Sequence, residues 1–120
     1  MAFTSSPTDG RFNDVASIET AATTTGTNDV HGAAATLYSV DIDNAATQDA
    51  YVKFYDAVTS VVTDLPILIL KVIQSTRRVF VFPDGIAFSS GITYRCVNAG
   101  GTAGATTPTG GNCSVTCITS

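Results

Sequence analysis

The sequence predicts an all-β fold: an antiparallel β-sandwich of about six to eight strands, jelly-roll or immunoglobulin-like, with an extended N-terminal arm. Three observations support this prediction. Apolar and polar residues alternate in several short segments, turn residues separate these segments at short intervals, and no long stretch keeps the helical period. A length of 120 residues suits a single domain with one small core.

Residues 1–35 are expected to form the arm. Large apolar side chains are sparse there, and the segment from Thr20 to Thr36 consists mainly of threonine, alanine, glycine and asparagine. A segment of this composition becomes ordered mainly when another surface supplies the burial. We therefore divide the chain into an arm, residues 1–35, and a β-sandwich domain, residues 36–120.

Two strands are expected directly after the arm. Between Leu37 and Asp43 apolar residues alternate with polar ones, which is the period of a half-buried strand. Residues 44–49 then form a turn, and AYVKFYD, residues 50–56, is the second strand. Its apolar residues Val52 and Phe54 are expected to face the core. The opposite face of this strand would carry one charge and consist of Tyr51, Lys53 and Tyr55.

Three more strands follow. ILILKVI, residues 67–73, lacks alternation at its start, so this strand is either covered on both sides or paired with a partner. RVFVF, residues 78–82, is the next strand, and the turn residues Pro83–Gly85 are expected to end it. ITYRCVN, residues 92–98, is the fifth strand.

A long loop and a sixth strand complete the predicted domain. Residues 98–112 consist almost wholly of glycine, threonine, alanine, asparagine and proline, and this connection is long for a compact domain. We expect the loop to be mobile or to face a partner. CSVTCITS, residues 113–120, is the sixth strand.

The charge of the chain argues against a nucleic-acid partner. Ten acidic residues against six basic ones give a net charge of −4 and a pI near 4.5, which leaves little basic surface to neutralise phosphates. The most apolar window, Val58–Phe82, is interrupted by charged residues and a proline, so we expect no transmembrane helix. The N-terminus lacks the features of a secretion signal, and we expect synthesis in a cytoplasm.

No constellation of residues predicts catalysis, a metal ion or a cofactor. His31 is the only histidine and lies in the low-complexity arm, where rigid positioning is not expected. DIDNAATQD, residues 41–49, lacks the glycine and glutamate of an EF-hand and is interpreted as a solvent-facing strand end with an Asx turn. In a strand Cys113 and Cys117 lie about 13 Å apart, too far for a disulfide. A bond from Cys96 to either one stays open, and three free thiols are the expected state.

Partner contacts are predicted at two places. Apolar residues in the arm are not explained by a monomer, and anchors of this kind on an extended segment suit docking on a neighbour. The only adjacent basic pair either protects an edge strand from pairing with other chains or binds a partner's carboxylates. The predicted partner-binding residues are Phe3, Arg11, Phe12, Ile18, Arg77 and Arg78.

Two stretches, DNAATQDAYVKFYDA (residues 43–57) and VFPDGIAFSSGITYRCVN (residues 81–98), resemble small virion proteins of tailed bacteriophages in the order of their turn, strand and corner motifs. The resemblance implies a virion component such as a capsid decoration, or cement, protein, which would lie on the capsid surface after synthesis in the bacterial host cytoplasm. Its implied partners are the major capsid protein and neighbouring copies of itself, in a homo-oligomer with a trimer favoured. Such a protein needs neither catalysis nor a cofactor.

Two other function classes fit the predicted fold. One is a tail, neck or baseplate component of a virion. The other is a host-binding or glycan-binding module that uses the loop at residues 98–112 for recognition. That loop has no Trp, Tyr or Arg to anchor a sugar or a protein, which weighs against the binding module.

Overall fold

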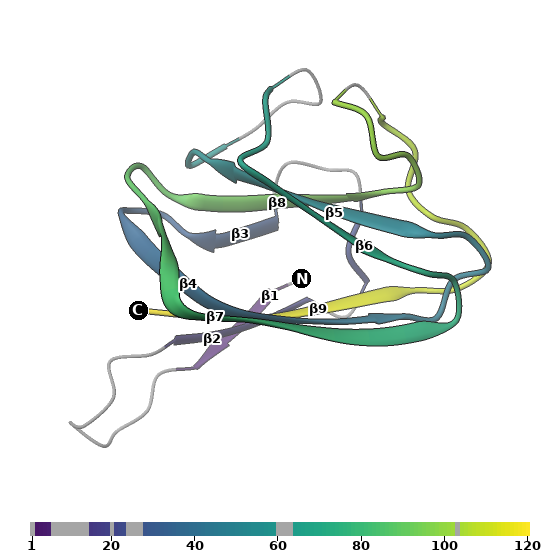
Figure 1. Cartoon of the computed structure of the whole chain (residues 1–120), viewed down its shortest axis with the longest axis horizontal. Coiled ribbons are helices and arrows are strands. Elements are labelled where there is room, and N and C mark those ends of the chain that lie inside the picture. The colour runs from purple at the N-terminus through teal and green to yellow at the C-terminus, as the bar shows by residue number, and fades with distance from the viewer. Residues whose placement is uncertain (1, 6–14, 20, 24–27, 60–63, 103) are drawn as a thin grey trace.

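The computed structural model of the chain is an antiparallel β-sandwich, as the sequence predicts. It describes residues 2–5, 15–19, 21–23, 28–59, 64–102 and 104–120, and these contain no helix. Two sheets pack against each other (Figure 1). The strands are β1 (Ala2–Ser5), β2 (Val15–Glu19), β3 (Asn28–His31), β4 (Ala35–Asn44), β5 (Ala50–Asp56), β6 (Leu68–Val72), β7 (Thr76–Phe88), β8 (Ile92–Val97) and β9 (Cys113–Thr119).

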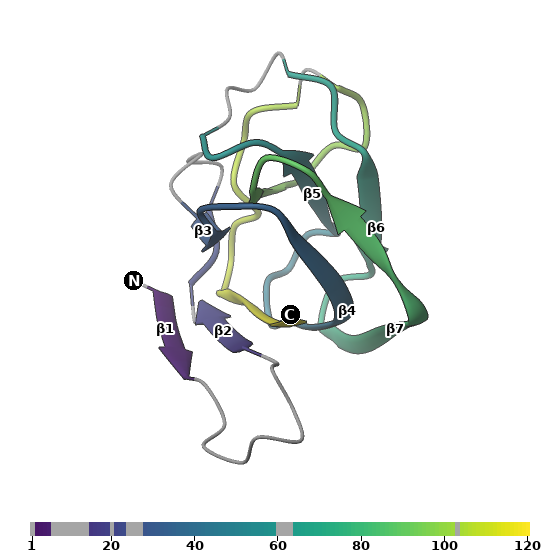
Figure 2. The same cartoon turned by 90° about the vertical axis from the view of Figure 1, so that its left-hand side faces the viewer.

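The first sheet has the strand order β1-β2-β9-β4-β7, and the second has the order β3-β8-β5-β6. All of these pairs are antiparallel. Strand β9 therefore lies in the middle of the first sheet, between β2 and β4. Strands β6 and β7 follow each other in the chain and form the two edges on one side of the sandwich (Figures 1 and 2).

The core lies between the two sheets. Every second residue of β9 is buried, and β4 buries Leu37, Val40 and Ile42, with a β-bulge between Leu37 and Ser39 that shifts the alternation by one residue. Across the core from these residues, Phe54 of β5 contacts Tyr94 of β8, with ring centroids 5.5 Å apart. The predictions of strands at β4, β5, β6, β8 and β9 are confirmed.

The segment assigned to the arm contributes strands to both sheets. Strand β2 pairs with β9, and β3 pairs with β8. Between them, the Ala22 N–H donates to the Cys113 carbonyl at 2.8 Å, and the Thr23 carbonyl accepts from the Cys96 N–H at 2.9 Å. The segment thus crosses from one sheet to the other, and Ala22 and Val30 belong to the core. The division at residue 35 therefore cuts through the sandwich, while docking of this segment on a partner stays a prediction.

Strand β7 is longer than predicted. The residues Pro83–Gly85, expected to end it, lie inside the strand. Gly85 adopts a φ of 74°, and a β-carbon there would lie 2.2 Å from the Thr36 side chain, so the position requires glycine. Proline is tolerated because β7 is an edge strand, where one missing N–H leaves no ladder unpaired. The predicted turn is a local bend in a continuous strand.

The face of β5 opposite Val52 and Phe54 carries Lys53, as the sequence predicts, but this face is covered and not open to solvent. Lys53 and Tyr55 are buried, and Lys53 donates from Nζ to the Gly101 carbonyl of the loop at residues 98–112. This burial raises the pKa of Tyr55 and lowers that of Lys53. The loop therefore covers the outer face of β5, which a local pattern of alternation does not reveal.

The loop between β8 and β9 is attached to the rest of the domain. The Gln48 Oε1 atom accepts from Asn98 Nδ2 and from the Thr109 N–H, both at 3.1 Å. Within the loop, the Asn98 N–H donates to the Thr106 carbonyl at 2.8 Å. The expectation of a mobile loop is thus not met by its described part, and partner contact through its exposed residues stays a prediction.

Asp56 at the end of β5 holds the turn between β7 and β8. Its carboxylate accepts hydrogen bonds from the Ser89 N–H and hydroxyl and from the Ser90 N–H, at 2.7 to 3.0 Å. These donors lower the Asp56 pKa from 3.8 to about 2. Because the folded pKa lies below the unfolded one, the stabilisation is present above about pH 4 and is lost as the pH falls towards 2.

Asp56→Asn is therefore expected to lower the stability at pH 7, and the difference from the natural chain should shrink between pH 4 and pH 2. Urea unfolding midpoints measured for both chains across this range test the prediction. A difference that stays constant with pH would show that the carboxylate charge is not what stabilises the turn.

Candidate functional site

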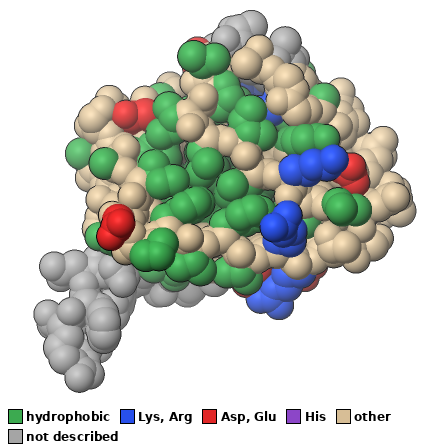
Figure 3. All heavy atoms as spheres, viewed as in Figure 1, with side chains coloured by type: hydrophobic (Ala, Val, Ile, Leu, Met, Phe, Trp, Pro, Cys, Tyr) green, Lys and Arg blue, Asp and Glu red, His purple; other side chains and the backbone are tan. Residues whose placement is uncertain are grey.

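Exposed aliphatic side chains gather where β6 and β7 form the open side of the sandwich. Leu65 is 79% exposed and Val81 65%, although both are large apolar residues. Figure 3 shows hydrophobic side chains over this side of the molecule, with basic side chains next to them. We call this set the β6–β7 apolar surface; it consists of Leu65, Ile67, Ile69, Ile73, Val79 and Val81. It has two parts, because the residues on and beside β6 point outward from the second sheet, whereas Val79 and Val81 lie opposite Asp41 and Ser39 on the outer face of the first sheet.

The surface arises because β6 carries aliphatic residues on both of its faces. Leu70 and Val72 point into the core, so Ile69 and the flanking Ile67 and Ile73 point outward. Of the two alternatives for residues 67–73, a strand covered on both sides is wrong, since Ile67, Ile69 and Ile73 are 50%, 39% and 56% exposed. Pairing with a partner remains a prediction. Exposed aliphatic groups of this extent indicate an interaction surface.

Charged side chains border the apolar surface. Lys71 lies 3.6 Å from the Asp49 carboxylate and above the ring of Tyr51. Arg78 lies over the Phe80 ring, 5.0 Å from its centroid, and is exposed. Asp84, also exposed, is on the other side of the apolar residues of β7. A rim of charge around an apolar centre is typical of protein interfaces.

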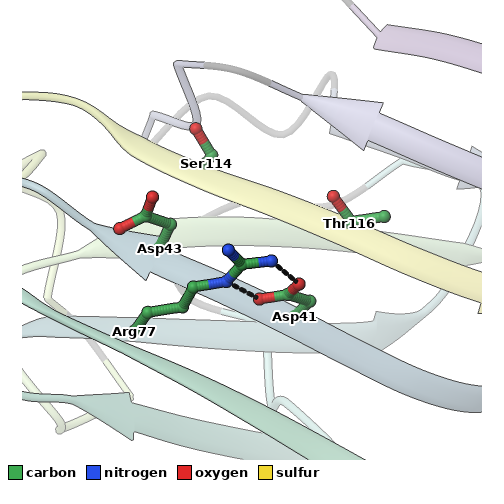
Figure 4. Close-up of a pocket in the computed structure, with 5 residues that line it drawn as sticks. All are labelled: Asp41, Asp43, Arg77, Ser114 and Thr116. Atoms are coloured by element: carbon green, nitrogen blue, oxygen red, sulfur yellow. Dashed lines mark hydrogen bonds and ion pairs between the residues drawn. The ribbon is translucent and has the colours of Figure 1, made fainter.

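Arg77 forms an ion pair within the chain. Its Nε and Nη2 atoms donate to the two carboxylate oxygens of Asp41 at 2.9 and 2.5 Å, which lowers the pKa of Asp41 (Figure 4). This pair lines a shallow polar depression on the outer face of the first sheet, together with Asp43, Ser114 and Thr116. Arg77 is thus already paired on its own sheet, whereas the guanidinium of Arg78 lies on the neighbouring aromatic ring. Carboxylate binding by either stays a prediction.

The other predicted partner-binding residues lie in the N-terminal segment. Phe3 and Ile18 are opposite each other in the β1–β2 pair, and the structure describes their backbone. Arg11 and Phe12 lie outside the described residues. The structure thus brings Phe3 and Ile18 together but places neither beside β7. For residues 67–73 a partner was one of the two sequence-based alternatives, whereas Leu65, Val79 and Val81 were not predicted as partner-binding residues.

The oxygen-rich segment at residues 41–49 forms hydrogen bonds within the chain. Asn44 is buried, and its Nδ2 donates to the carbonyls of Gln48 and Val72 at 3.0 and 3.1 Å. Its Oδ1 accepts from the Ala46 N–H at 3.1 Å, which is an Asx turn as expected. Asp43, Ala45 and Thr47 face solvent, as expected, whereas the Asn44 side chain is buried. Among the described residues, no group of three or more histidine, cysteine or acidic side chains is arranged for a metal ion.

The three cysteines are free and buried. The thiols of Cys96 and Cys113 are hydrogen-bonded to each other across the two sheets, which raises the pKa of Cys96. Burial raises the pKa of Cys117 to about 12. The hydrogen bond between Cys96 and Cys113 lowers the pKa of Cys113. Slow reaction is therefore expected of Cys96 and Cys117 because of burial and a raised pKa, and of Cys113 because of burial alone.

We expect none of the three thiols to react promptly with a disulfide reagent such as DTNB in the folded chain, and all three to react in denaturant. Absorbance measurements with and without guanidinium check this. Prompt reaction of even one thiol under native conditions would contradict the burial described above.

Within the described residues, the structure holds no helix long and apolar enough to cross a membrane. Comparison of the chain with protein-family models, with curated proteins and with solved structures finds no significant match. The functional argument therefore depends on the surface of this chain and on the sequence resemblance described above.

Proposed function

We propose that this chain is a virion structural protein, a capsid decoration or cement protein that binds the major capsid protein and stabilises the head of a tailed bacteriophage. The β6–β7 apolar surface is the observation that supports this function most directly. When a second protein covers its aliphatic groups, the free energy of the complex falls by about 25 cal/mol per Å² of buried apolar area. The resemblance of residues 43–57 and 81–98 to phage virion proteins supplies the choice of partner.

In this proposal the protein stabilises the shell simply by staying bound to it. The β6 side of the surface, with Ile67, Ile69 and Ile73, covers apolar residues on adjacent shell subunits and links them. A protein that binds only the assembled shell stabilises it in proportion to its occupancy. The rigid sandwich fixes these side chains in place, so little conformational entropy is lost on binding.

The test uses particles of the phage whose genome carries this gene. Purified virions are expected to contain the chain, as measured by mass spectrometry, and particles lacking it are expected to assemble but release DNA at a lower temperature. Purified chain added back should restore heat resistance along a saturable binding curve. Ile69→Asp should restore it only at much higher concentration, because a charge would be buried on binding.

Ala34→Asp is the matched control, since Ala34 is exposed in the connection between β3 and β4, and neither of these strands pairs with β6. This variant should restore resistance as well as the natural chain does. Virions without the chain, or particles equally heat-resistant when they lack it, would contradict the proposal. A defect confined to host attachment would favour a tail or adhesion function.

A further inference from the structure

The outer edge of β7 has no partner strand among the described residues. In the first sheet β7 pairs with β4 on one side only, and its residues Val79 and Val81 are 58% and 65% exposed. An edge strand of this length with exposed aliphatic residues is a template for pairing with another strand. The question is which strand fits it.

The sequence of β7 complements itself when read in the opposite direction. Its segment RVFVFPD, residues 78–84, has an arginine at one end, an aspartate at the other and apolar residues between. In an antiparallel pair with Val81 on a two-fold axis, residue numbers opposite each other add up to 162. Arg78 of each copy then lies opposite Asp84 of the other, which places opposite charges at both ends of the pair.

No other register of this segment gives the same match. Residues opposite each other in an antiparallel pair share a sheet face, so a two-fold pair must place one residue opposite itself. With Phe80 at the axis, Arg78 would oppose Phe82; with Phe82 at the axis, Asp84 would oppose Phe80. Only the axis at Val81 leaves both charges paired and the apolar residues opposite one another.

The neighbouring residues are compatible with this register. Arg77, already paired with Asp41, would lie opposite Gly85 and would face no positive charge. Gly85 has a left-handed φ, and the pairing of β7 with β4 skips from Val81 to Ile86, so a regular ladder along the outer edge ends before Gly85. Pro83 has no N–H to donate and lies near that end, opposite Val79, which limits the number of main-chain hydrogen bonds and predicts a dimer of moderate affinity.

We propose that a second copy of this chain binds along β7, forming a two-fold dimer in which the first sheets of both copies join into one continuous sheet centred on Val81. The dimer is a different contact from the shell contact assigned to β6, and it favours a two-fold assembly over the trimer expected from the sequence. It stands or falls independently of the virion function.

The first test exchanges the two charges. Sedimentation of the full chain at increasing concentration should show a monomer–dimer equilibrium. Arg78→Asp and Asp84→Arg should each weaken dimerisation about tenfold or more, because each change places like charges opposite each other twice per dimer. The double variant R78D/D84R should restore it. Both side chains are exposed, so we expect the variants to fold, and circular dichroism checks this.

The second test fixes the register. Val81→Cys should form a disulfide-linked dimer under mild oxidation by oxidised glutathione, because position 81 is the one residue that faces itself. Val79→Cys, equally exposed on the same strand, faces Pro83 and should not cross-link. The natural chain, whose three cysteines are buried, is the control for cross-linking without an added cysteine.

A chain that stays monomeric at millimolar concentration would overturn the proposal, as would a double charge variant that fails to dimerise or cross-linking at position 79 in place of position 81. Ile69→Asp should leave the dimer intact. If it does so while abolishing protection of particles, the two surfaces are separate; if the dimer forms but virions lack the chain, only the proposed function fails.

Discussion

Replacing Phe54 by alanine is expected to lower the free energy of unfolding by about 3 to 5 kcal/mol, the range for truncating a buried aromatic side chain. Phe54 has no exposed area and contacts Tyr94 between the two sheets, so the neighbouring side chains cannot refill the space without moving a strand. This is a large share of the stability of a small domain. Urea unfolding followed by far-ultraviolet circular dichroism measures the change.

Val81→Ala is the control for Phe54→Ala, because it also truncates an apolar strand residue, but an exposed one. In the monomer it should change the stability by less than about 0.5 kcal/mol. Tyr55→Ala should lie between the two, since Tyr55 is buried on the outer face of β5 and does not face the opposite sheet. A larger effect at Tyr55 than at Phe54 would mean that the register of β5 is shifted by one residue.

Asn44→Asp is expected to be the second strongly destabilising change, by about 3 kcal/mol or more at neutral pH. The Nδ2 group of Asn44 donates to two carbonyls inside the structure, and a carboxylate would place a negative charge against both of them. The variant should regain part of its stability as the pH falls and the new carboxyl becomes protonated. Thermal unfolding at pH 4 and at pH 7 measures both effects.

Asn112→Asp is the matched control, since Asn112 is exposed and the same chemical change there removes no buried donor. Its unfolding temperature should stay close to that of the natural chain at both pH values. Equal losses at positions 44 and 112 would show that the added charge acts through the whole molecule and not through the buried hydrogen bonds.

The sequence predicts the fold class and most strands because the alternation of apolar and polar residues is a local property. The alternation of β4 and β9 appears in the structure as alternating burial, and the pattern fails only where a bulge shifts it after Leu37. The positions of β2 and β3 could not be predicted in this way. Their segments are short, and their order comes from hydrogen bonds to β8 and β9, which are distant in the sequence.

The candidate surface was predictable only in part. The apolar character of residues 67–73 indicated a strand with a second covered face or a partner, but not that β6 is an edge strand. The buried position of Lys53 could not be predicted either, because the loop that supplies its hydrogen-bond acceptor starts 45 residues later, at position 98. Pairings between distant segments decide which aliphatic residues remain exposed, and a single sequence does not encode them locally.

The central position of β9 has a consequence for how the protein is made. Strands β2 and β4 are both synthesised before β9, yet each forms its pair with β9 in the finished sheet. The ribosome must therefore complete residues 113–119 before the first sheet can close, and until then both strands have an unpaired edge. Contacts between such distant segments also slow folding, into the millisecond-to-second range typical of β-sandwiches. Until β9 is made, these edges are open to pairing with strands of other chains.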